Sequence, residues 1–337
     1  MQWFLREMLE CPACHGALAW TVTDVRANQI EEGAARCMSC HAVYPVREGI
    51  GLFLTPDLPR DDLWEAAASG LARHLSEHPE VERQLLDVPL AALAPADQFF
   101  RALVLEERGA FKDAQAAYEA ARPRLYTPEY LACFESEMDC VVARLAAGTD
   151  PVVDLASGRG ELAWRLIARL DRPIVITDFS PRILRRNRRR LEADGLYSRA
   201  SLLAFDALRT PFKPGAVAAL TTNLGLGNIG QPEALLAELR RVVSGTFLAV
   251  TYFHPDYDAG NGAAIEASGA ASLLYRRPAL THFAASGWQV AELNLCIGHA
   301  EPTPTGVVIE GARIDGLPVA PTELEWCVLE ARPRVDR

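Results

Sequence analysis

Residues 152–166 read VVDLASGRGELAWRL and carry the clearest indication of the fold. An apolar strand pattern ends in Asp154, a turn of small residues follows, and a helical pattern begins at Glu161. Small residues in such a turn let a ligand approach the backbone, and the helix N-terminus offers unpaired N–H groups. Because a glycine turn after a strand is common, this stretch alone is only a weak indication of a binding site.

Two further carboxylates follow strand patterns after this turn. Asp178 ends the run PIVITD, and Asp206 ends the run SLLAFD. Parallel strands bring their carboxyl ends to one edge of a sheet, so we expect these side chains to share a crevice with Asp154. Asp178 is placed to accept from the hydroxyls of a ribose, and Asp206 to reach an adenine edge.

The sequence of the turn also bears on which of two cofactors would fit such a crevice. A nicotinamide dinucleotide favours G-x-G-x-x-G, which seats a pyrophosphate on the helix N-terminus. Here the turn reads A-S-G-R-G, and Glu161 follows it directly. A carboxylate at the helix start disfavours a pyrophosphate and tolerates a cationic ligand without phosphate. These residues therefore favour S-adenosylmethionine.

The segments D-L-A-S-G-R-G, T-D-F-S-P and F-D-A resemble the class I S-adenosylmethionine-dependent methyltransferases over roughly residues 149–335. This resemblance implies an α/β fold with a doubly wound, Rossmann-like sheet and an antiparallel last strand. It implies that the turn binds the methionine end of the cofactor, and that Asn223 and Leu224 flank the sulfonium. The cofactor-binding residues expected from it are Asp154, Ala156, Ser157, Gly158, Gly160, Asp178, Phe179, Asp206, Ala207, Asn223 and Leu224.

The composition divides the chain into three predicted parts. Residues 1–56 contain two Cys-x-x-Cys pairs and short strand patterns, and residues 57–148 have helical spacing. Residues 149–337 alternate apolar strand runs with helices, which is typical of a parallel sheet. In the middle part, residues 98–124 predict a helical hairpin, and Thr127 is placed to cap the helix that follows.

The two Cys-x-x-Cys pairs are Cys11 with Cys14 and Cys37 with Cys40. Four thiolates at this spacing suit a structural Zn²⁺ with no open coordination position. The flanking stretches MLECPACHGAL and YPVREGIGLFL resemble the zinc ribbon of the tRNA-methyltransferase activator subunit. Its combination with a methyltransferase domain resembles the ribosomal RNA guanine-N1 methyltransferases. We expect this ribbon to be a recognition or docking module, and a protein partner is one candidate.

The composition limits the binding partners and the cellular compartment that we expect for this protein. The net charge of −10 and the pI of about 5.3 disfavour a general nucleic-acid-binding surface. No apolar run approaches the ~20 residues of a membrane span, and the first ten residues lack the apolar core of a signal peptide. We expect a cytoplasmic protein without membrane association. A reducing cytoplasm favours metal binding over disulfides, and Cys133 and Cys140 are expected to be core residues.

The methyl acceptor stays open between a small molecule and RNA, and the acidic charge favours the small molecule. Most arginines in the run RILRRNRRR are expected to face outward, namely Arg182, Arg185, Arg186, Arg189 and Arg190. This basic face is either simply solvated or a contact surface for RNA phosphates.

After the fifth strand run of residues 149–337, His254 is the candidate general base, with a packing role as its alternative. Three tyrosines of the helical part are expected to pack in a core rather than line an acceptor pocket; they are Tyr118, Tyr126 and Tyr130. A different hypothesis is a catalytically silent methyltransferase-like scaffold that binds a partner protein through the ribbon.

Overall fold

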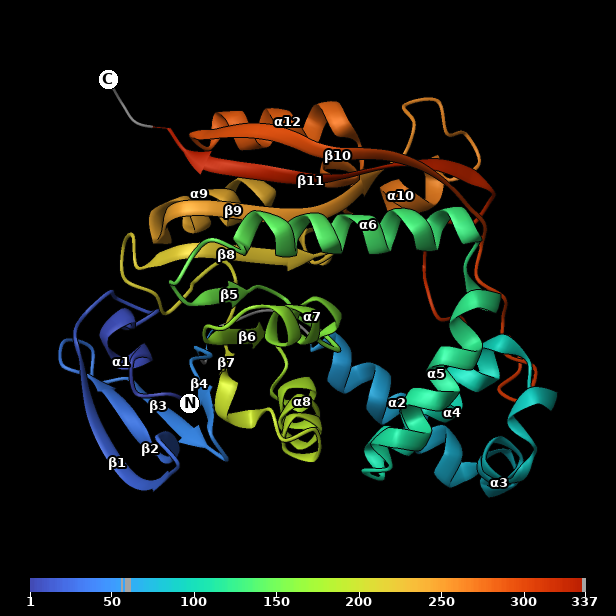
Figure 1. Cartoon of the computed structure of the whole chain (residues 1–337), viewed down its shortest axis with the longest axis horizontal. Coiled ribbons are helices and arrows are strands. Elements are labelled where there is room, and N and C mark those ends of the chain that lie inside the picture. The colour runs from blue at the N-terminus through green and yellow to red at the C-terminus, as the bar shows by residue number, and fades with distance from the viewer. Residues whose placement is uncertain (56, 58–61, 335–337) are drawn as a thin grey trace.

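The computed structural model describes residues 1–55, 57 and 62–334. Two predicted domain limits, residues 56 and 337, lie outside the described residues. The central feature is one eleven-stranded sheet in the order β1-β2-β3-β4-β7-β6-β5-β8-β9-β11-β10 (Figure 1). The strands are β1 (Leu18–Arg26), β2 (Gln29–Cys37), β3 (Val43–Arg47), β4 (Ile50–Leu52), β5 (Val152–Asp154), β6 (Ile174–Asp178), β7 (Ala200–Ala204), β8 (Val217–Asn223), β9 (Val243–Phe253), β10 (Trp288–Ala300) and β11 (Thr322–Pro333).

Helices cover both faces of the sheet and form a separate group beside it (Figure 1). The α-helices are α1 (Leu5–Met8), α2 (Leu63–Glu77), α3 (Pro79–Asp87), α4 (Pro95–Glu107), α5 (Phe111–Leu125), α6 (Pro128–Leu145), α7 (Glu161–Arg169), α8 (Pro181–Ala193), α9 (Pro232–Val242), α10 (Gly262–Ser268), α11 (Ala271–Leu274) and α12 (Arg276–Ala285). The described residues also contain the short 3₁₀ helices η1 (Leu90–Ala92), η2 (Tyr197–Arg199) and η3 (Leu226–Asn228).

The doubly wound part runs from β7 to β10. Strands β7, β6, β5, β8 and β9 pair in parallel. Strand β11 inserts between β9 and β10 and pairs with both in antiparallel fashion. This arrangement confirms the predicted α/β class and the antiparallel last strand. It also brings the carboxyl ends of β5, β6, β7 and β8 to one edge, where the predicted cofactor residues follow.

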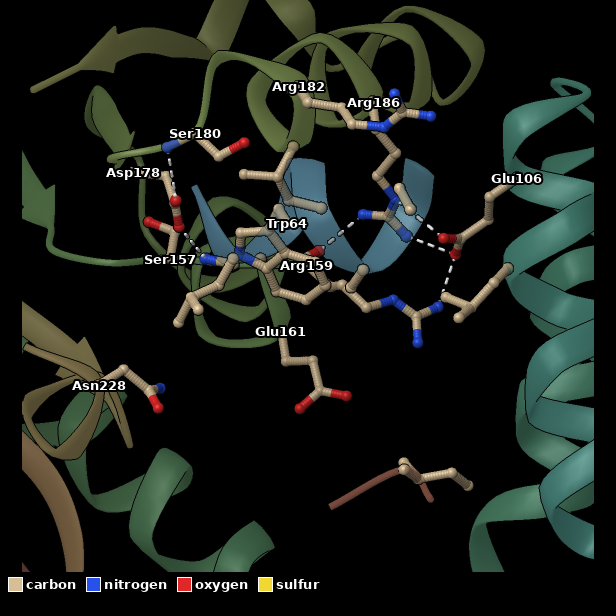
Figure 2. Close-up of a pocket in the computed structure, with 18 of the residues that line it drawn as sticks. Trp64, Glu106, Ser157, Arg159, Glu161, Asp178, Ser180, Arg182, Arg186 and Asn228 are labelled. Carbon is tan, nitrogen blue, oxygen red and sulfur yellow. Dashed lines mark hydrogen bonds and ion pairs between the residues drawn. The ribbon is translucent and has the colours of Figure 1, made fainter. Parts of the chain in front are cut away.

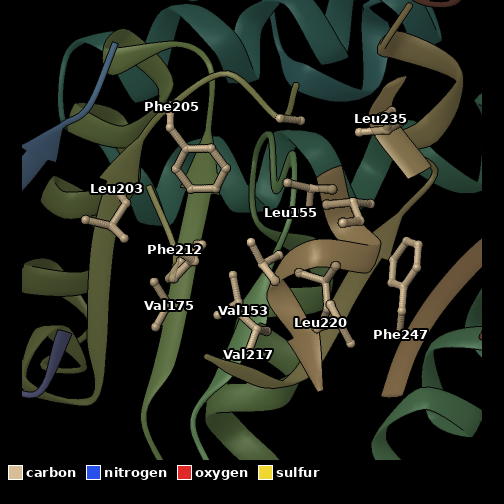
Figure 3. Close-up of a cluster of buried hydrophobic side chains, with 14 of the residues drawn as sticks. Val153, Leu155, Val175, Leu203, Phe205, Phe212, Val217, Leu220, Leu235 and Phe247 are labelled. Carbon is tan, nitrogen blue, oxygen red and sulfur yellow. The ribbon is translucent and has the colours of Figure 1, made fainter. Parts of the chain in front are cut away.

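The two core layers follow from the alternation of side chains along the buried strands. Val153 and Leu203 pack on the face that α9 and α12 cover, together with Phe212 from the loop after β7 (Figure 3). The neighbouring Val152 and Leu202 point to the other face and pack against α6, α7 and α8. Strands buried on both faces read as continuous apolar runs, which is why the sequence predicted them clearly.

The cysteine-bearing strands continue the same sheet. Strands β1 to β4 form an antiparallel meander. Strand β4 then pairs in parallel with β7, with Ile50 opposite Leu202. A further bridge joins Leu9 to Phe212, and the Glu10 carboxylate lies 2.7 Å from the Arg241 guanidinium. No sequence pattern predicted this union of the ribbon with the methyltransferase sheet.

The helical part contains the predicted hairpin. Helices α4 and α5 pack against each other on either side of a turn in which Gly109 has a φ of +76°. The next helix, α6, begins as expected, because the Thr127 hydroxyl accepts from the Tyr130 N–H at 3.2 Å. Helix α6 then runs along β10 and β11 (Figure 1). The hairpin and the start of α6 therefore stand beside the carboxyl edge of the sheet.

The expectation of metal binding in place of disulfides was wrong for one pair of cysteines, because Cys133 on α6 forms a disulfide with Cys296 on β10. The expectation that Cys133 is a core residue is confirmed, since Cys133 is 1% exposed. Cys140, one of the six free cysteines, is partly buried. The spacing of residues along a helix carries no information about a strand 163 positions away, so the sequence could not reveal this pairing.

Within the described residues, no helix is both long and apolar enough to cross a membrane.

Candidate active site

A cavity of about 1200 Å³ lies where the parallel strands end (Figure 2). Its inner wall is formed by the loops after β5, β6, β7 and β8, and its outer wall by α2, α4, α5 and the start of α6. Pockets for single small ligands commonly measure roughly 300–1,000 Å³. The cavity therefore has room for a cofactor and an acceptor together.

Most of the expected cofactor residues line this cavity. They are Ala156, Ser157, Gly158, Gly160, Asp178, Phe179, Ala207, Asn223 and Leu224. The structure brings these residues together from the ends of β5, β6, β7 and β8. Asp154 and Asp206 are each 1% exposed and do not line the cavity. The binding roles of the whole set stay predictions.

The turn after β5 has the conformation that small residues allow. Ala156, Gly158 and Gly160 have φ values of +50°, +52° and +83°. A left-handed conformation costs a residue with a Cβ roughly 1–2 kcal/mol, so Ala156 is tolerated at a modest cost. At Gly158 an added Cβ would also lie 3.2 Å from the ring of Trp64, which leaves little room for any side chain.

Asp178 organises this turn. Its Oδ2 accepts from the Gly158 N–H at 2.9 Å, and its Oδ1 accepts from the Ser180 N–H at 3.0 Å. The Ser157 N–H donates to the Thr177 carbonyl at 2.8 Å, which ties the turn to the end of β6. Burial raises the pKa of the Asp178 carboxyl to about 6. The carboxylate thus shapes the turn while it faces the cavity.

Asp154 connects the strand before the turn to the neighbouring strand β8. Its Oδ1 accepts from the Thr221 hydroxyl at 2.7 Å, which joins the ends of β5 and β8. Burial raises the pKa of the Asp154 carboxyl to about 6. Asp206 accepts from the Leu208 N–H at 2.9 Å and so shapes the loop after β7.

The arginine-rich helix α8 braces the turn. Arg186 is 3% exposed and donates to the Arg159 carbonyl at 2.8 Å, and Asn187 donates to the Gly158 carbonyl at 2.8 Å. Arg186 also forms an ion pair with Glu106 of α4, and the Arg159 guanidinium contacts the same carboxylate at 2.6 Å (Figure 2). The expectation that Arg186 faces outward was therefore wrong, because a buried carboxylate from a distant helix neutralises it.

Other arginines of α8 also have acidic partners. Arg182 lies 3.2 Å from Glu65 and 3.4 Å from Glu107, so it ties α8 to α2 and α4. Arg188 lies 2.9 Å from Glu31 of the ribbon strand β2. The run therefore joins the helical part and the ribbon to the sheet, and much of its charge is neutralised within the chain.

The outer wall of the cavity is aromatic and apolar. Tyr118, Tyr126 and Tyr130 line it, which corrects the expectation of simple core packing. The Tyr118 hydroxyl donates to Glu161, and the Tyr126 hydroxyl donates to Asp315 at 2.9 Å. Between α2 and α4 the apolar residues of the lining are Leu63, Trp64, Ala67, Leu71, Leu75, Phe99, Phe100, Leu103 and Val104. The carboxylates of Glu82, Glu106 and Glu107 line the same side of the cavity.

Sequence reasoning missed some of these lining residues. Trp64 lies in a helical pattern that indicates no site, and Asp315 lies between β10 and β11 with no motif around it. In the sequence, Glu161 indicated only that a pyrophosphate is disfavoured at the start of the helix. In the structure its side chain points into the open space between the turn and the outer helices (Figure 2).

His254 lies outside the lining of this cavity. Its ring is buried, and its Nδ1 lies 3.0 Å from Oδ2 of Asp258. The same carboxylate accepts from the hydroxyl of Thr322, at the start of β11. This cluster fixes the end of β9 against β11, and the predicted role of His254 as a general base receives no support from its position.

The four cysteines predicted to bind metal come together in the ribbon. Their sulfur atoms all lie within 4.8 Å of one another. The Sγ atoms of Cys11 and Cys40 lie 3.6 Å apart, and those of Cys14 and Cys37 lie 3.4 Å apart. Sulfur atoms around a tetrahedral Zn²⁺ lie about 3.8 Å apart, given Zn–S bonds of about 2.3 Å. The donor set therefore fits a structural zinc ion.

Two family models match separate parts of this chain. Residues 152–245 match the family described as "Methyltransferase domain", and residues 4–49 match the family described as "Trm112p-like protein". The YcgJ protein from Bacillus subtilis is 12% identical with a TM-score of 0.47, covering 60% of this chain and 100% of that chain. Geranyl diphosphate C-methyltransferase from Streptomyces coelicolor A3(2) is 17% identical with a TM-score of 0.46, covering 66% of this chain and 86% of that chain.

Curated relatives match part of the chain. The demethylmenaquinone methyltransferase of Thermus thermophilus is 42% identical over 31% of this chain and 47% of its own length. The ubiquinone/menaquinone biosynthesis C-methyltransferase UbiE of Dinoroseobacter shibae is 26% identical over 40% of this chain and 54% of its own. The chain thus spans about half the length of the curated relatives it matches. It joins an S-adenosylmethionine-type methyltransferase domain to a Trm112p-like zinc ribbon.

Proposed function

We propose that this protein is an S-adenosylmethionine-dependent methyltransferase whose acceptor is a small aromatic molecule with a hydroxyl group and an apolar chain. The observation that carries this proposal is the cavity of about 1200 Å³, which places the predicted cofactor turn opposite an aromatic and apolar wall. The cofactor supplies a methyl group on a positively charged sulfur, so the protein mainly has to position the acceptor and exclude water.

The inner wall suits this cofactor chemically. The carboxylate of Asp178 can accept from ribose hydroxyls while its backbone contacts hold the turn. Glu161 places a carboxylate at the start of α7, which attracts a cationic group and repels a phosphate. Asn223, the last residue of β8, and Leu224 after it line the same cavity beside the turn.

The outer wall suits an aromatic acceptor with an apolar chain. Tyr126 and Tyr130 stack with their ring centres 4.8 Å apart, which fixes two flat surfaces at the start of α6. The apolar lining between α2 and α4 can accommodate a chain without leaving polar groups unpaired. The relatives named for demethylmenaquinone and for ubiquinone/menaquinone biosynthesis support a quinone-type acceptor of this kind.

RNA is less favoured as the acceptor. An RNA site needs free cationic groups to contact phosphates, whereas Arg182, Arg186 and Arg188 have acidic partners from other elements. The ribbon contacts its own chain through the pairing of β4 with β7, so it can support the methyltransferase sheet without a partner protein.

Two measurements test the proposal. Calorimetry should show binding of S-adenosylhomocysteine by the wild type and its loss in Asp178→Ala. Asp171→Ala, which changes a solvent-exposed carboxylate, is the matched control and should bind normally. Failure of the wild type to bind would refute the assignment of the cofactor.

The acceptor is tested by transfer of a labelled methyl group. Reduced demethylmenaquinone should become labelled, and total RNA should not. Labelling of RNA alone would overturn the small-molecule acceptor. Cofactor binding without transfer to either substrate, together with a protein that co-purifies, would favour the silent scaffold instead.

A further inference from the structure

One carboxylate in the cavity belongs to a segment that lies outside both matched families. Asp315 lies between β10 and β11, and it lines the cavity together with Glu161 and with Tyr118, Tyr126 and Tyr130. The two family matches cover residues 4–49 and 152–245, so neither of them includes this segment. The fold brings Asp315 to the wall of the cavity that carries these tyrosines.

The position of the Asp315 carboxylate is defined by its neighbours. Its Oδ2 accepts from the Tyr126 hydroxyl at 2.9 Å, and the ring of Tyr126 stacks on Tyr130 with an angle of 13° between the planes. Tyr130 in turn packs edge-on against Trp326 of β11, with ring centres 5.0 Å apart. In the part of the chain that the structure describes, Oδ1 of Asp315 has no hydrogen-bond donor and can accept one from a ligand.

The surroundings of Asp315 favour proton uptake. Burial raises the pKa of its carboxyl, the hydrogen bond from Tyr126 lowers it, and the negative charge of Glu161 raises it, with a net rise. Burial, together with the negative charge of Asp315, raises the pKa of the phenols of Tyr130 and Tyr252, so they stay neutral near pH 7. A carboxylate with a raised pKa is a stronger base than one in water.

Other candidates for a base fit less well. Glu161 follows the cofactor turn directly and already accepts from Tyr118, which suits it to the cationic cofactor. His254 lies outside the cavity lining and is held by Asp258. Arg313 lines the cavity near Asp315 but cannot accept a proton at neutral pH.

We propose that Asp315 is the general base that accepts the hydroxyl proton of the acceptor; this inference rests on the proposed function. The proton moves from the acceptor oxygen to Oδ1 of Asp315. The ring carbon that gains electron density then bonds to the methyl carbon, while the carbon–sulfur bond breaks and its electron pair stays on sulfur. The hydrogen on that ring carbon leaves to water as a proton, and Asp315 returns its own proton to the acceptor oxygen.

The test compares variants with reduced demethylmenaquinone as the acceptor. Asp315→Asn should lower kcat by roughly 10²–10⁴-fold, the range for loss of a general base, and should abolish the acid limb of the pH profile of kcat. S-adenosylhomocysteine should bind Asp315→Asn within about twofold of wild type, which shows that the variant folds. Glu310→Gln, an exposed carboxylate in the same segment, is the control and should behave as wild type.

A second variant separates a catalytic role from a structural one. Tyr126→Phe removes the hydrogen bond that lowers the pKa of Asp315, so the acid limb should move to higher pH. Full activity and an unchanged profile in Asp315→Asn would overturn the inference while the proposed function stands. Absence of transfer by the wild type would instead refute the proposed acceptor, and the inference would fall with it.

Discussion

Replacing Glu106 by glutamine probes the connection between the helical part and the cofactor turn. The Glu106 side chain is buried and accepts from Nε of Arg186 at 3.1 Å and from Nη2 of Arg159 at 2.6 Å. Arg186 also donates to the backbone carbonyl of Arg159 within the turn. Glutamine keeps the size of the side chain but removes the negative charge, so the two guanidinium groups lose their shared partner.

The expected effect is large because one of these charges is nearly inaccessible to water. Breaking a buried ion pair by removing one partner costs roughly 3–5 kcal/mol. The Arg186 side chain is 3% exposed and the Arg159 side chain 15% exposed, so water relieves only part of the penalty. We expect the free energy of unfolding to fall by about 3 kcal/mol, the lower end of that range.

The effect should also depend on pH. Burial opposes ionisation of Glu106, but Arg159 and Arg186 outweigh it and hold the pKa of the carboxyl below its usual value. A group whose folded pKa is lowered stabilises the protein above its unfolded pKa and loses this contribution as pH falls through the folded pKa. The difference between wild type and Glu106→Gln should therefore be full at pH 7 and shrink in acid.

Urea unfolding from pH 7 to pH 4 measures this difference. The control is Glu107→Gln, because the Glu107 side chain is 48% exposed and its contacts with Arg182 and Arg189 measure 3.4 and 3.9 Å. Such an exposed pair should contribute at most about 1 kcal/mol. A loss in Glu106→Gln no larger than that in Glu107→Gln at pH 7 would refute the reasoning.

Three further predictions concern the cofactor, the metal and the disulfide. Burial raises the pKa of Asp178 to about 6, so the affinity for S-adenosylhomocysteine, measured by calorimetry, should fall as this carboxyl protonates below that pH. Asp178→Asn should remove this pH dependence of the affinity. An equal pH dependence in the variant would contradict the prediction. Metal analysis should find one zinc per chain, lost in Cys37→Ser and kept in Cys140→Ser; equal zinc in both would exclude the four-cysteine site. Without reductant, the denatured, zinc-free protein should titrate six thiols, and Cys296→Ser should lower the free energy of unfolding by roughly 2–5 kcal/mol; eight thiols would contradict the disulfide.

The parts of the fold that could be predicted are those with local signals. The turn from Asp154 to Gly160 combines a buried strand, small residues and a helix start, all within a few positions. The two Cys-x-x-Cys pairs likewise indicate a metal site, because zinc coordination restricts both the type of the ligand residues and their spacing. The hairpin of α4 and α5 and the cap at Thr127 follow from helical periodicity and capping preference.

Other parts depend on contacts between residues far apart in the chain. The pairing of β4 with β7 could not be read from β4, since a three-residue strand carries almost no pattern. Arg186 looked like a solvated charge because its partner, Glu106, lies on another helix with no sequence relation to it. Tyr126 and Tyr130 looked like core residues because an aromatic side chain fits equally well beside a core and beside a cavity.

Local signals in the amino-acid sequence were enough to predict a doubly wound sheet with an acidic crevice and a closed cysteine site, because alternation, turn chemistry and metal-ligand spacing are local properties. What faces that crevice became visible only once the elements were packed together. Tyr118, Tyr126, Tyr130 and Asp315 belong to the lining of the cavity, and His254 lies outside that lining. The physical reason is that a binding cavity is enclosed by side chains from separate elements, and their meeting is determined by packing of the whole chain.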